Sequence, residues 1–363
     1  MSSVAPRDAS DEFQRERHIK YLLRCLSVLP NAYISMDTSR MTILFFALSG
    51  LDLLNALDKI QNETTNIINW IYSLQILPEN TDTAATGDKN KCGFRGSHFL
   101  GYDFNVEGSF TSSCEYEGSH IAMTYSALLS LLILKDDLSR VNKEAIVMGL
   151  KSLQLDNGSF YSTPEGSEND MRFLYCGCCV SYLLQDWRGV DRVKAMSYVK
   201  NSLGYDYGVS QGPQLESHGG STFCAVASLV LMGGLDECFT QRQQEKLKRW
   251  CMVRQKNGFQ GRPNKPVDTC YSFWVGGTLH LLGAYPMIDP AANQEFLLST
   301  QNPLVGGFSK WPDVMSDILH TYFGLCGLSL MNLYDLQPIS PALNISVRTE
   351  KHLEQVHQSW KPT

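Results

Sequence analysis

The sequence lacks an apolar run long enough to cross a bilayer. Its longest apolar runs, such as residues 127–134, fall far short of the roughly 20 residues that a spanning helix needs. No charged-then-apolar signal segment opens the chain, and residues 359–363 carry no lipidation motif. We therefore expect a protein with no membrane span and no lipid anchor of its own.

The sequence also lacks an excess of basic over acidic residues. The 363 residues include 31 lysines and arginines against 37 aspartates and glutamates, which gives a net charge of −6. This balance argues against a general nucleic-acid binder, because such a protein needs a broad positive surface to neutralise phosphates. Most of the eleven cysteines lie in apolar helical runs, as buried free thiols do, so we expect a reducing, cytoplasmic compartment.

Strand patterns are nearly absent, and apolar helical patterns predominate. We expect residues 1–15 to be a flexible N-terminal segment and residues 16–363 to form one domain. Early helices are predicted over residues 15–29, 43–57 and 65–74. Residues 79–118 are rich in Thr, Asn, Gly and Ser and are too long for an ordinary connector, so we interpret them as a functional or interface loop.

A repeat of about 50 residues organises the rest of the chain. Turns that combine glycine with an aromatic residue recur at Gly158, Gly208, Gly258 and Gly307, which are 50, 50 and 49 residues apart, and Gly93 marks a weaker copy. Each turn follows a helix that often ends in glutamine. Each precedes a more apolar helix, and these second helices are predicted to begin near Ser119, Asp170, Gly220, Asp268 and Asp317.

This unit of two helices, repeated five or six times, predicts an all-α fold. We expect an α–α barrel (a toroid) of repeated helical hairpins with inner and outer helix layers. An open solenoid is the alternative. Closure is favoured because the inner helices are apolar nearly all round, which suits an interior position. In either case the N-termini of the inner helices meet at one end of the molecule, where we expect the functional site.

Residues 261–274 are expected at that end and contain the densest group of charged, thiol and aromatic side chains in the sequence. Asp268 and Cys270 follow a rigid basic loop, and the repeat places His320 beside them from the next unit. These three side chains are a plausible zinc set with an open fourth position. Asp268 has to remain in a non-helical cap, because residues two apart on a helix face different ways. Taken alone, a helix cap, a core thiol and a buried donor are the more common interpretation.

Basic and aromatic residues surround this set in the repeat alignment. His218, Arg262, Lys265, Tyr271 and Lys310, together with helix N-termini, suit a polyanion such as a diphosphate, although a solvated charged loop is the simpler interpretation for any one cation. Aromatic side chains at corresponding inner-helix positions could line an apolar cavity or could simply pack the core: Tyr125, Tyr175, Phe223, Phe273, Trp274 and Tyr322.

The glycine–phenylalanine repeats and residues 217–220, 261–265, 268–274 and 317–322 resemble protein prenyltransferase β subunits. The resemblance covers nearly the whole chain and is strongest to the type I geranylgeranyl branch of that family. It implies an α–α barrel, one zinc ion and an obligate α subunit shared with protein farnesyltransferase.

The resemblance also implies roles for individual residues. Asp268, Cys270 and His320 correspond to zinc ligands, and Lys310 joins them as a catalytic position. His120 and Leu319 correspond to peptide-binding positions. The positions expected to bind geranylgeranyl diphosphate are Thr42, Arg172, Tyr175, His218, Gly219, Gly220, Arg262, Pro263, Asn264, Lys265, Tyr271, Ser272, Phe273 and Trp274.

Three positions distinguish the geranylgeranyl branch of this family from the farnesyl branch. Thr42 stands where the farnesyl enzyme has a bulky tryptophan, so a 20-carbon chain is expected to fit. Leu319 replaces a tyrosine, which favours a C-terminal Leu or Phe on CaaX proteins such as small GTPases. Lys310 stands where the farnesyl enzyme has a magnesium-binding aspartate, so magnesium is not expected to be required.

Two alternatives remain open at this point. The first is a farnesyltransferase β subunit, and the second, from another class, is a non-catalytic helical-repeat scaffold that binds peptides. Cys176, Cys178 and Cys179 resemble a metal cluster, but we interpret them as core thiols.

Overall fold

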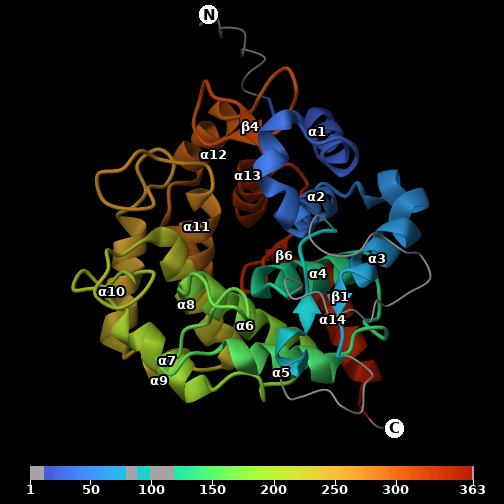
Figure 1. The fold of residues 1–363 in the computed structure, drawn as a ribbon. Coiled ribbons are helices and arrows are strands. Elements are labelled where there is room, and N and C mark those ends of the chain that lie inside the picture. The colour runs from blue at the N-terminus through green and yellow to red at the C-terminus, as the bar shows by residue number, and fades with distance from the viewer. Residues whose placement is uncertain (1–11, 79–87, 99–117, 362–363) are drawn as a thin grey trace, which may run out of the picture.

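The computed structural model describes residues 12–78, 88–98 and 118–361. Within this part of the chain two sets of helices alternate, an inner set around the centre of a ring and an outer set that covers it (Figure 1). The inner helices are α2 (Arg40–Leu53), α4 (Ile121–Ile133), α6 (Met171–Leu184), α8 (Gly219–Met232), α11 (Tyr271–Leu281) and α13 (Ile318–Leu330). The outer helices are α1 (Arg15–Ser27), α3 (Thr64–Ser73), α5 (Lys143–Leu153), α7 (Arg192–Asn201), α10 (Gln241–Met252) and α12 (Pro290–Ser299).

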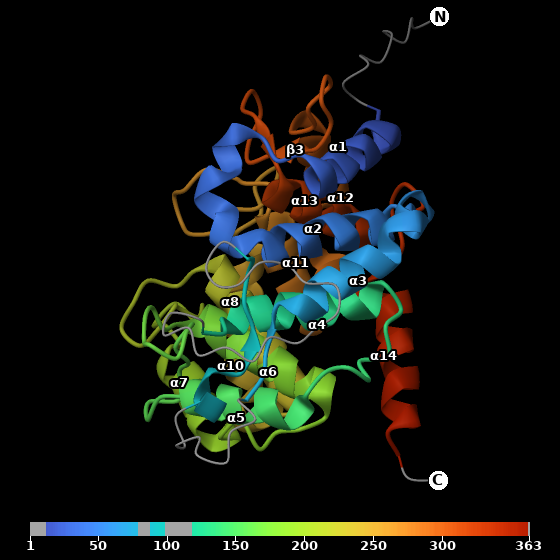
Figure 2. The same cartoon turned by 45° about the vertical axis from the view of Figure 1, so that its right-hand side comes forward.

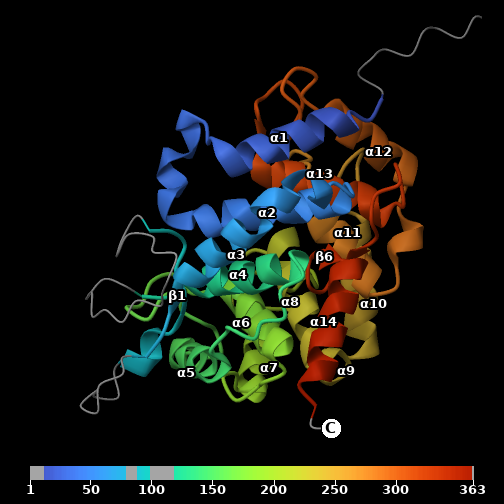
Figure 3. The same cartoon turned by 90° about the vertical axis from the view of Figure 1, so that its right-hand side faces the viewer.

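Shorter elements fill the connections between these helices. They comprise η1 (Asn31–Ser39), η2 (Leu57–Glu63), η3 (Asp88–Lys91), α9 (Leu235–Cys238) and η4 (Tyr285–Met287). Three antiparallel two-stranded ladders pair β1 (Gln75–Ile76) with β2 (Gly93–Phe94), β3 (Phe308–Ser309) with β4 (Ser316–Asp317), and β5 (Ile339–Ser340) with β6 (Ile345–Ser346). The last helix, α14 (Val347–Ser359), runs along the outside of the ring and contacts α4 (Figures 2 and 3).

The ring is closed, so the predicted α–α barrel is confirmed and the open solenoid is wrong. Each inner helix contacts the next one, and α13 contacts α2 to complete the circle. Burial explains why the inner helices are apolar all round: every residue of α4 except Ala122 is buried. Among the described residues, no helix combines the length and apolar character that crossing a membrane requires.

Glutamines at the ends of outer helices join one unit to the next. Gln255 donates to the carbonyl of Asp289 (2.7 Å) and accepts from its N–H (2.9 Å), just ahead of α12. Gln154 makes the same pair of bonds with Asp191, ahead of α7. Gln301, in the last unit, accepts from the N–H of Gln14 at 2.9 Å and so joins α12 to the start of α1. The glutamines noted in the sequence therefore join neighbouring units, and Gln301 also joins the last unit to the first helix.

Threonines on inner helices fix the glycine turns. The N–H of Phe308, after Gly307, donates to the hydroxyl of Thr321 at 2.9 Å. Phe94, after Gly93, donates in the same way to Thr124 at 2.9 Å, so the weaker copy is a true member of the repeat. Gly307 has a φ of +81°, a backbone conformation that favours glycine.

One predicted helix is shifted by several residues in the structure. The helix predicted over residues 43–57 is α2, which begins at Arg40 and ends at Leu53. It ends early because Asn55 adopts a left-handed φ of +54° and the N–H of Ala56 turns back to the carbonyl of Leu51. The predicted loop over residues 79–118 lies largely outside the described residues. Residues 1–11 also lie outside them, so the flexible N-terminal segment and the single domain over 16–363 stay predictions.

Candidate active site

The loops that precede the inner helices are joined in sequence around one end of the ring, which we call the mouth. At the start of α8 the N–H of Gly219 donates to the carbonyl of Gly261 in the next unit at 2.8 Å. Thr269, ahead of α11, donates in the same way to Lys310 at 3.0 Å. Because neighbouring units are joined loop to loop, side chains far apart in the sequence meet at the mouth.

Asp268, Cys270 and His320 converge there. One possible ligand atom from each lies within 4.8 Å of the others, and no other such group occurs among the described histidines, cysteines, aspartates and glutamates. The three sulfur atoms of Cys176, Cys178 and Cys179 form no comparable group and are buried in α6, as core thiols are. Ten cysteines lie in the described residues, and all ten are buried and free.

A tight turn places Asp268 and Cys270 on the same side. The structure corrects the expected helix start: α11 begins at Tyr271, so Cys270 immediately precedes the helix instead of lying within its first turn. The N–H of Tyr271 donates to the carbonyl of Asp268 at 3.1 Å, and the N–H of Cys270 donates to the Asp268 carboxylate at 2.9 Å. The turn removes the difficulty that residues two apart on a helix diverge.

His320 is held by carboxylates at both ring nitrogens. Asp317 is the N-cap of α13, and its carboxylate accepts from the N–H of His320 at 2.9 Å and lies 2.6 Å from Nδ1. Nε2 lies 3.2 Å from the carboxylate of Asp268. A carboxylate behind a histidine is the usual means of fixing the orientation of a metal-binding imidazole. Sequence reasoning missed this role of Asp317, although a carboxylate three residues before a candidate ligand was the available signal.

The electrostatics of the three groups suit a cation. Burial raises the pKa of the Cys270 thiol well above its usual value, and the Asp268 carboxylate raises it further. Burial lowers the pKa of His320, but hydrogen bonds to Asp268 and Asp317 outweigh that effect and raise it to about 9. Once Cys270 and His320 have lost their protons, the ligands carry a charge of −2, which matches a divalent ion. Sulfur, nitrogen and oxygen donors of this kind are those found in zinc sites.

Cationic and hydrogen-bonding side chains surround the triad. The ammonium of Lys310 lies 3.7 Å from the Asp268 carboxylate. Nε2 of His218 lies 2.9 Å from the Tyr271 hydroxyl, while its Nδ1 accepts from the N–H of Gly220 at the start of α8. Burial lowers the pKa of His218, and the nearby Arg262 lowers it further. Because Nδ1 accepts this bond, the proton of a neutral His218 lies on Nε2, which can donate to the Tyr271 hydroxyl or to a ligand at the mouth.

The basic loop ahead of α11 is more exposed than the triad. Arg262 pairs with the Glu216 carboxylate at 2.8 Å. Pro263 and Lys265 are exposed, and Asn264 adopts a left-handed φ of +61° that forms the turn. These side chains therefore lie at the rim of the mouth.

A cavity of about 380 Å³ opens beside the triad. Seven of the predicted site residues line it: Thr42, Arg172, Tyr175, His218, Gly220, Trp274 and Leu319. Tyr125, predicted as an aromatic lining residue, lies there too. Its wall is largely aromatic and apolar, with polar groups near the mouth, which is typical of a site for an amphiphilic ligand.

Several expected residues are placed elsewhere. Ser272 is buried and donates to Asn293 of the outer helix α12 at 2.8 Å, so it points away from the cavity. Phe273 is fully buried against Phe223 and Phe323. Gly219 lies at the contact between α8 and α11, where a Cβ would approach Val275 to 2.9 Å.

His120 is placed close to the cavity without being part of its wall. It caps α4 by accepting from the N–H of Ala122 at 3.1 Å, and its ring lies 6.0 Å from that of Phe173. Its neighbour Ala122 does line the cavity.

Of the six aromatic residues expected to line a cavity or pack the core, Tyr125, Tyr175 and Trp274 line the cavity and the other three pack the core. Phe223, Phe273 and Tyr322, fifteen residues after a turn glycine, are fully buried. The next residues along, Cys224, Trp274 and Phe323, line the cavity in all three units. Sequence reasoning also missed the lining residues Phe45, Phe46, Gln211 and Asn344.

Comparisons with known proteins cover nearly the whole chain. Residues 13–345 match the family described as the prenyltransferase alpha-alpha toroid domain. The geranylgeranyl transferase type-1 subunit beta of Dictyostelium discoideum is 40% identical over 338 residues, which is 92% of this chain and 95% of that protein. The protein of the same name from Arabidopsis thaliana is 37% identical over 345 residues, 93% of this chain and 90% of that protein.

A solved structure agrees with these relatives. It is described as Candida albicans protein geranylgeranyltransferase-I complexed with GGPP. Its TM-score is 0.82 at 27% sequence identity, and the match covers 95% of this chain and 99% of that chain. The similarity therefore extends over the ring, the mouth and the cavity together.

Proposed function

Since the chain belongs to the prenyltransferase alpha-alpha toroid family, we propose that it acts as the catalytic β subunit of a type I protein geranylgeranyltransferase. Such an enzyme transfers a geranylgeranyl group from geranylgeranyl diphosphate to the cysteine of a C-terminal CaaX motif. The observation that carries this proposal is the convergence of Asp268, Cys270 and His320 beside a largely apolar cavity.

Asp268, Cys270 and His320 would hold a zinc ion, with Asp317 orienting the imidazole. When bound, zinc supplies the Lewis acidity that lowers the pKa of a thiol into the range where it is a nucleophile at neutral pH. Three protein ligands leave the fourth position open, as catalytic zinc sites do. The mouth can therefore receive a cysteine from a protein substrate.

The reaction forms a bond between the substrate sulfur and C1 of the isoprenoid and breaks the bond from C1 to the diphosphate oxygen. The thiol proton leaves to solvent, and diphosphate departs with the bonding electron pair. His218, Arg262, Lys265, Tyr271 and Lys310 are the groups we assign to the diphosphate, where they stabilise the charge that develops on its oxygens. The cavity wall orients the isoprenoid, so its contribution is proximity.

Three positions support a 20-carbon donor and a CaaX acceptor ending in Leu or Phe. Thr42 lines the cavity with a short side chain whose hydroxyl contacts the sulfur of Met123 at 3.4 Å. Leu319 lies at the rim, 37% exposed, where it can contact the last residue of a peptide. The ammonium of Lys310 can neutralise diphosphate in place of magnesium, so we propose that turnover does not depend on that ion.

The proposal includes partners and a location. We propose that the chain works with an α subunit of the kind shared with protein farnesyltransferase, on CaaX proteins such as small GTPases, in the cytoplasm. We keep the domain assignment of residues 16–363.

The test is co-expression with that α subunit, followed by zinc analysis and paired assays with 15-carbon and 20-carbon diphosphates on a Cys-a-a-Leu peptide, with and without magnesium. We expect one zinc per heterodimer and preferential transfer of the 20-carbon group without magnesium. Preference for the 15-carbon donor with a magnesium requirement would identify a farnesyltransferase β subunit instead. A heterodimer that binds peptide but neither holds zinc nor transfers lipid would identify a scaffold.

A further inference from the structure

The cavity ends on a short backbone segment from near the C-terminus. Residues 341–344 form the turn between β5 and β6, and we call them the floor segment. Asn344, its last residue, lines the cavity together with Thr42, Phe45, Phe46 and Phe323. The segment comes from outside the hairpin repeat, so the cavity is bounded by a part of the chain with its own sequence.

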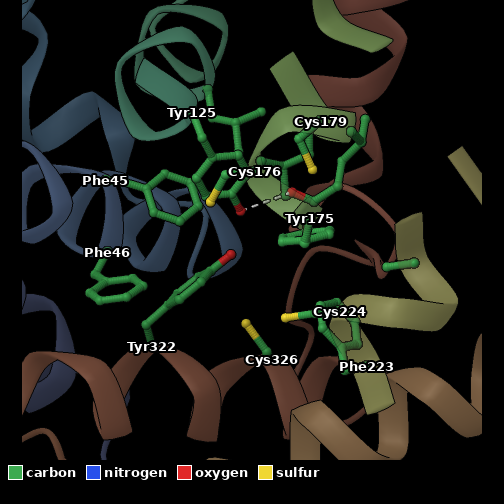
Figure 4. Packing of buried hydrophobic residues seen from close by; sticks show 14 of the residues in the cluster. Phe45, Phe46, Tyr125, Tyr175, Cys176, Cys179, Phe223, Cys224, Tyr322 and Cys326 are labelled. Carbon is green, nitrogen blue, oxygen red and sulfur yellow. Dashed lines mark hydrogen bonds between the residues drawn. The ribbon is translucent and has the colours of Figure 1, made fainter. Parts of the chain in front are cut away.

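Three tyrosines from three inner helices hold the floor segment. Tyr175 of α6 donates to the carbonyl of Ala342 at 2.9 Å, Tyr125 of α4 to that of Leu343 at 3.5 Å, and Tyr322 of α13 to that of Asn344 at 2.6 Å. Figure 4 shows these three rings pointing toward one another from separate helices. Three successive backbone carbonyls are thus bound by tyrosines from one side of the ring of helices.

The same tyrosines are also packed through their rings: Tyr125 lies tilted against Tyr175, and Phe45 of α2 packs edge-on against Tyr125 and Tyr322. Tyr125 lies 5.7 Å from Tyr175 and 5.6 Å from Phe45, and Phe45 lies 5.7 Å from Tyr322, measured between ring centroids. The Tyr322 hydroxyl also accepts from Ser49 at 2.7 Å. Moving the floor segment would leave buried carbonyls without donors, at roughly 1–3 kcal/mol for each one. The floor is therefore fixed in depth.

Asn344 has a backbone conformation that few residues tolerate. Its φ is +57°, its N–H donates to the carbonyl of Ser340 at 3.0 Å, and it is only 2% exposed. Its side-chain oxygen lies 3.8 Å from the sulfur of Cys326. Glycine, asparagine, aspartate and histidine are the residues that adopt this region most readily. Glycine, asparagine and histidine differ in size, so each of these three would set a different depth for the cavity.

We propose that Asn344 is a specificity-determining residue that limits how long an isoprenoid chain the cavity accepts. This inference rests on the proposed function and deepens it. Thr42 gives the isoprenoid room at the wall of the cavity, and Asn344 sets where the cavity ends. An isoprenoid that is one five-carbon unit too long meets a floor that cannot move. A larger residue at 344 raises the floor, and glycine lowers it.

Two variants with opposite expected effects test the proposal in the α–β heterodimer. Asn344→Gly keeps the backbone unstrained and removes the side chain, and Asn344→His enlarges it in a conformation that histidine tolerates. The assay compares kcat/KM for 15-, 20- and 25-carbon diphosphates. Asn332→Gly is the matched control, because Asn332 also has a left-handed φ, +54°, but is exposed and not among the cavity-lining residues.

We expect Asn344→Gly to raise the ratio of kcat/KM for the 25-carbon to that for the 20-carbon diphosphate about 10-fold. Asn344→His should lower the ratio of kcat/KM for the 20-carbon to that for the 15-carbon diphosphate about 10-fold. A change of about 10-fold is at the lower end of the discrimination that a poor fit in an apolar pocket produces. Asn332→Gly should change neither ratio. Ratios unchanged in both Asn344 variants would overturn the proposal. If a variant lost turnover, the Kd values of the three diphosphates would give the same ratios with the same consequence. Wild-type protein that fails to transfer the 20-carbon group would refute the proposed function instead.

Discussion

The mouth and the floor of the cavity are built from different interactions. At the mouth, Asp268, Lys310 and His320 are charged or titratable groups that contact one another and can exchange those contacts for a ligand. At the floor, neutral tyrosine hydroxyls bind backbone carbonyls, and burial raises the pKa of Tyr125 and Tyr322 so that they stay protonated. The difference indicates that the groups able to bind and react lie at the mouth, whereas the floor fixes the shape of the cavity.

The largest expected effect is at the mouth. Cys270→Ser should remove the metal and lower turnover by about 1,000-fold or more, because a bound metal contributes several kcal/mol of transition-state stabilisation. Metal content and steady-state turnover of the heterodimer measure this effect. Cys251→Ser, a buried thiol on the outer helix α10, is the control and should retain both. A metal-free Cys270→Ser protein with full activity would mean that the mouth has been misassigned.

The second prediction concerns the loss of stability in acid. Like the tyrosines of the floor, His18 makes its hydrogen bonds as a neutral, buried group. His18 accepts from the N–H of Gly307 at 3.0 Å and lies 2.9 Å from the side-chain oxygen of Gln301. Burial lowers its pKa to about 4. The unfolded chain, with a pKa near its usual 6.5, binds the proton more readily, so stability is full above about pH 6.5 and is lost as the pH falls toward 4. The loss approaches about 3 kcal/mol.

Denaturant unfolding at pH 7, 5.5 and 4.5 measures this loss. His18→Gln should weaken the pH dependence, since glutamine does not titrate, whereas His280→Gln, at an exposed position, should largely preserve it. A His18→Gln protein with the full wild-type pH dependence would show that other groups cause the acid loss.

A smaller effect is expected behind the metal ligands. Asp317→Ala removes the carboxylate 2.6 Å from Nδ1 of His320 and should weaken zinc affinity about 10- to 100-fold. Competition with a chelator measures the affinity. Because Asp317 also caps α13, Asp317→Ser, which can cap but cannot orient the imidazole as an anion, separates the two roles. Wild-type affinity in both variants would show that His320 needs no carboxylate behind it.

The smallest effect is expected at the floor. Tyr322→Phe leaves the carbonyl of Asn344 without its donor and should lower the free energy of unfolding by about 1–3 kcal/mol. Metal content should not change, because the hydroxyl belongs to the floor and not to the mouth. Thermal melting and zinc analysis on one sample test both statements, and loss of zinc would mean that the two regions are coupled.

The repeat and the metal triad could be predicted from the sequence because both follow a spacing. Cys270 and His320 follow the turn glycines Gly258 and Gly307 of adjacent units by 12 and 13 residues, and the structure brings their side chains together. The cavity wall was harder to predict. One residue along a helix turns the side chain by about 100°, so Phe273 and Trp274 are equally plausible lining residues until the rotation of α11 is known.

The floor could not be predicted from the sequence. Asn344 lies in an irregular turn, and Leu343 meets Tyr125 from 218 residues away. No periodicity links such positions, and the chemistry of an asparagine in a turn points first to local structure. The role of Gln301 in closing the ring was hidden for the same reason, because its partner Gln14 belongs to the opposite end of the chain.

That contact between Gln301 and Gln14 spans 287 residues and has a consequence for biosynthesis. At ribosomal rates of about 5–20 residues per second, the first helix waits about 15–60 s before the segment that covers it has been made. During that interval α1 and α2 expose apolar faces that only the last unit can bury. The nascent chain therefore passes through a long period in which chaperones, or an early-binding subunit, would protect it from aggregation.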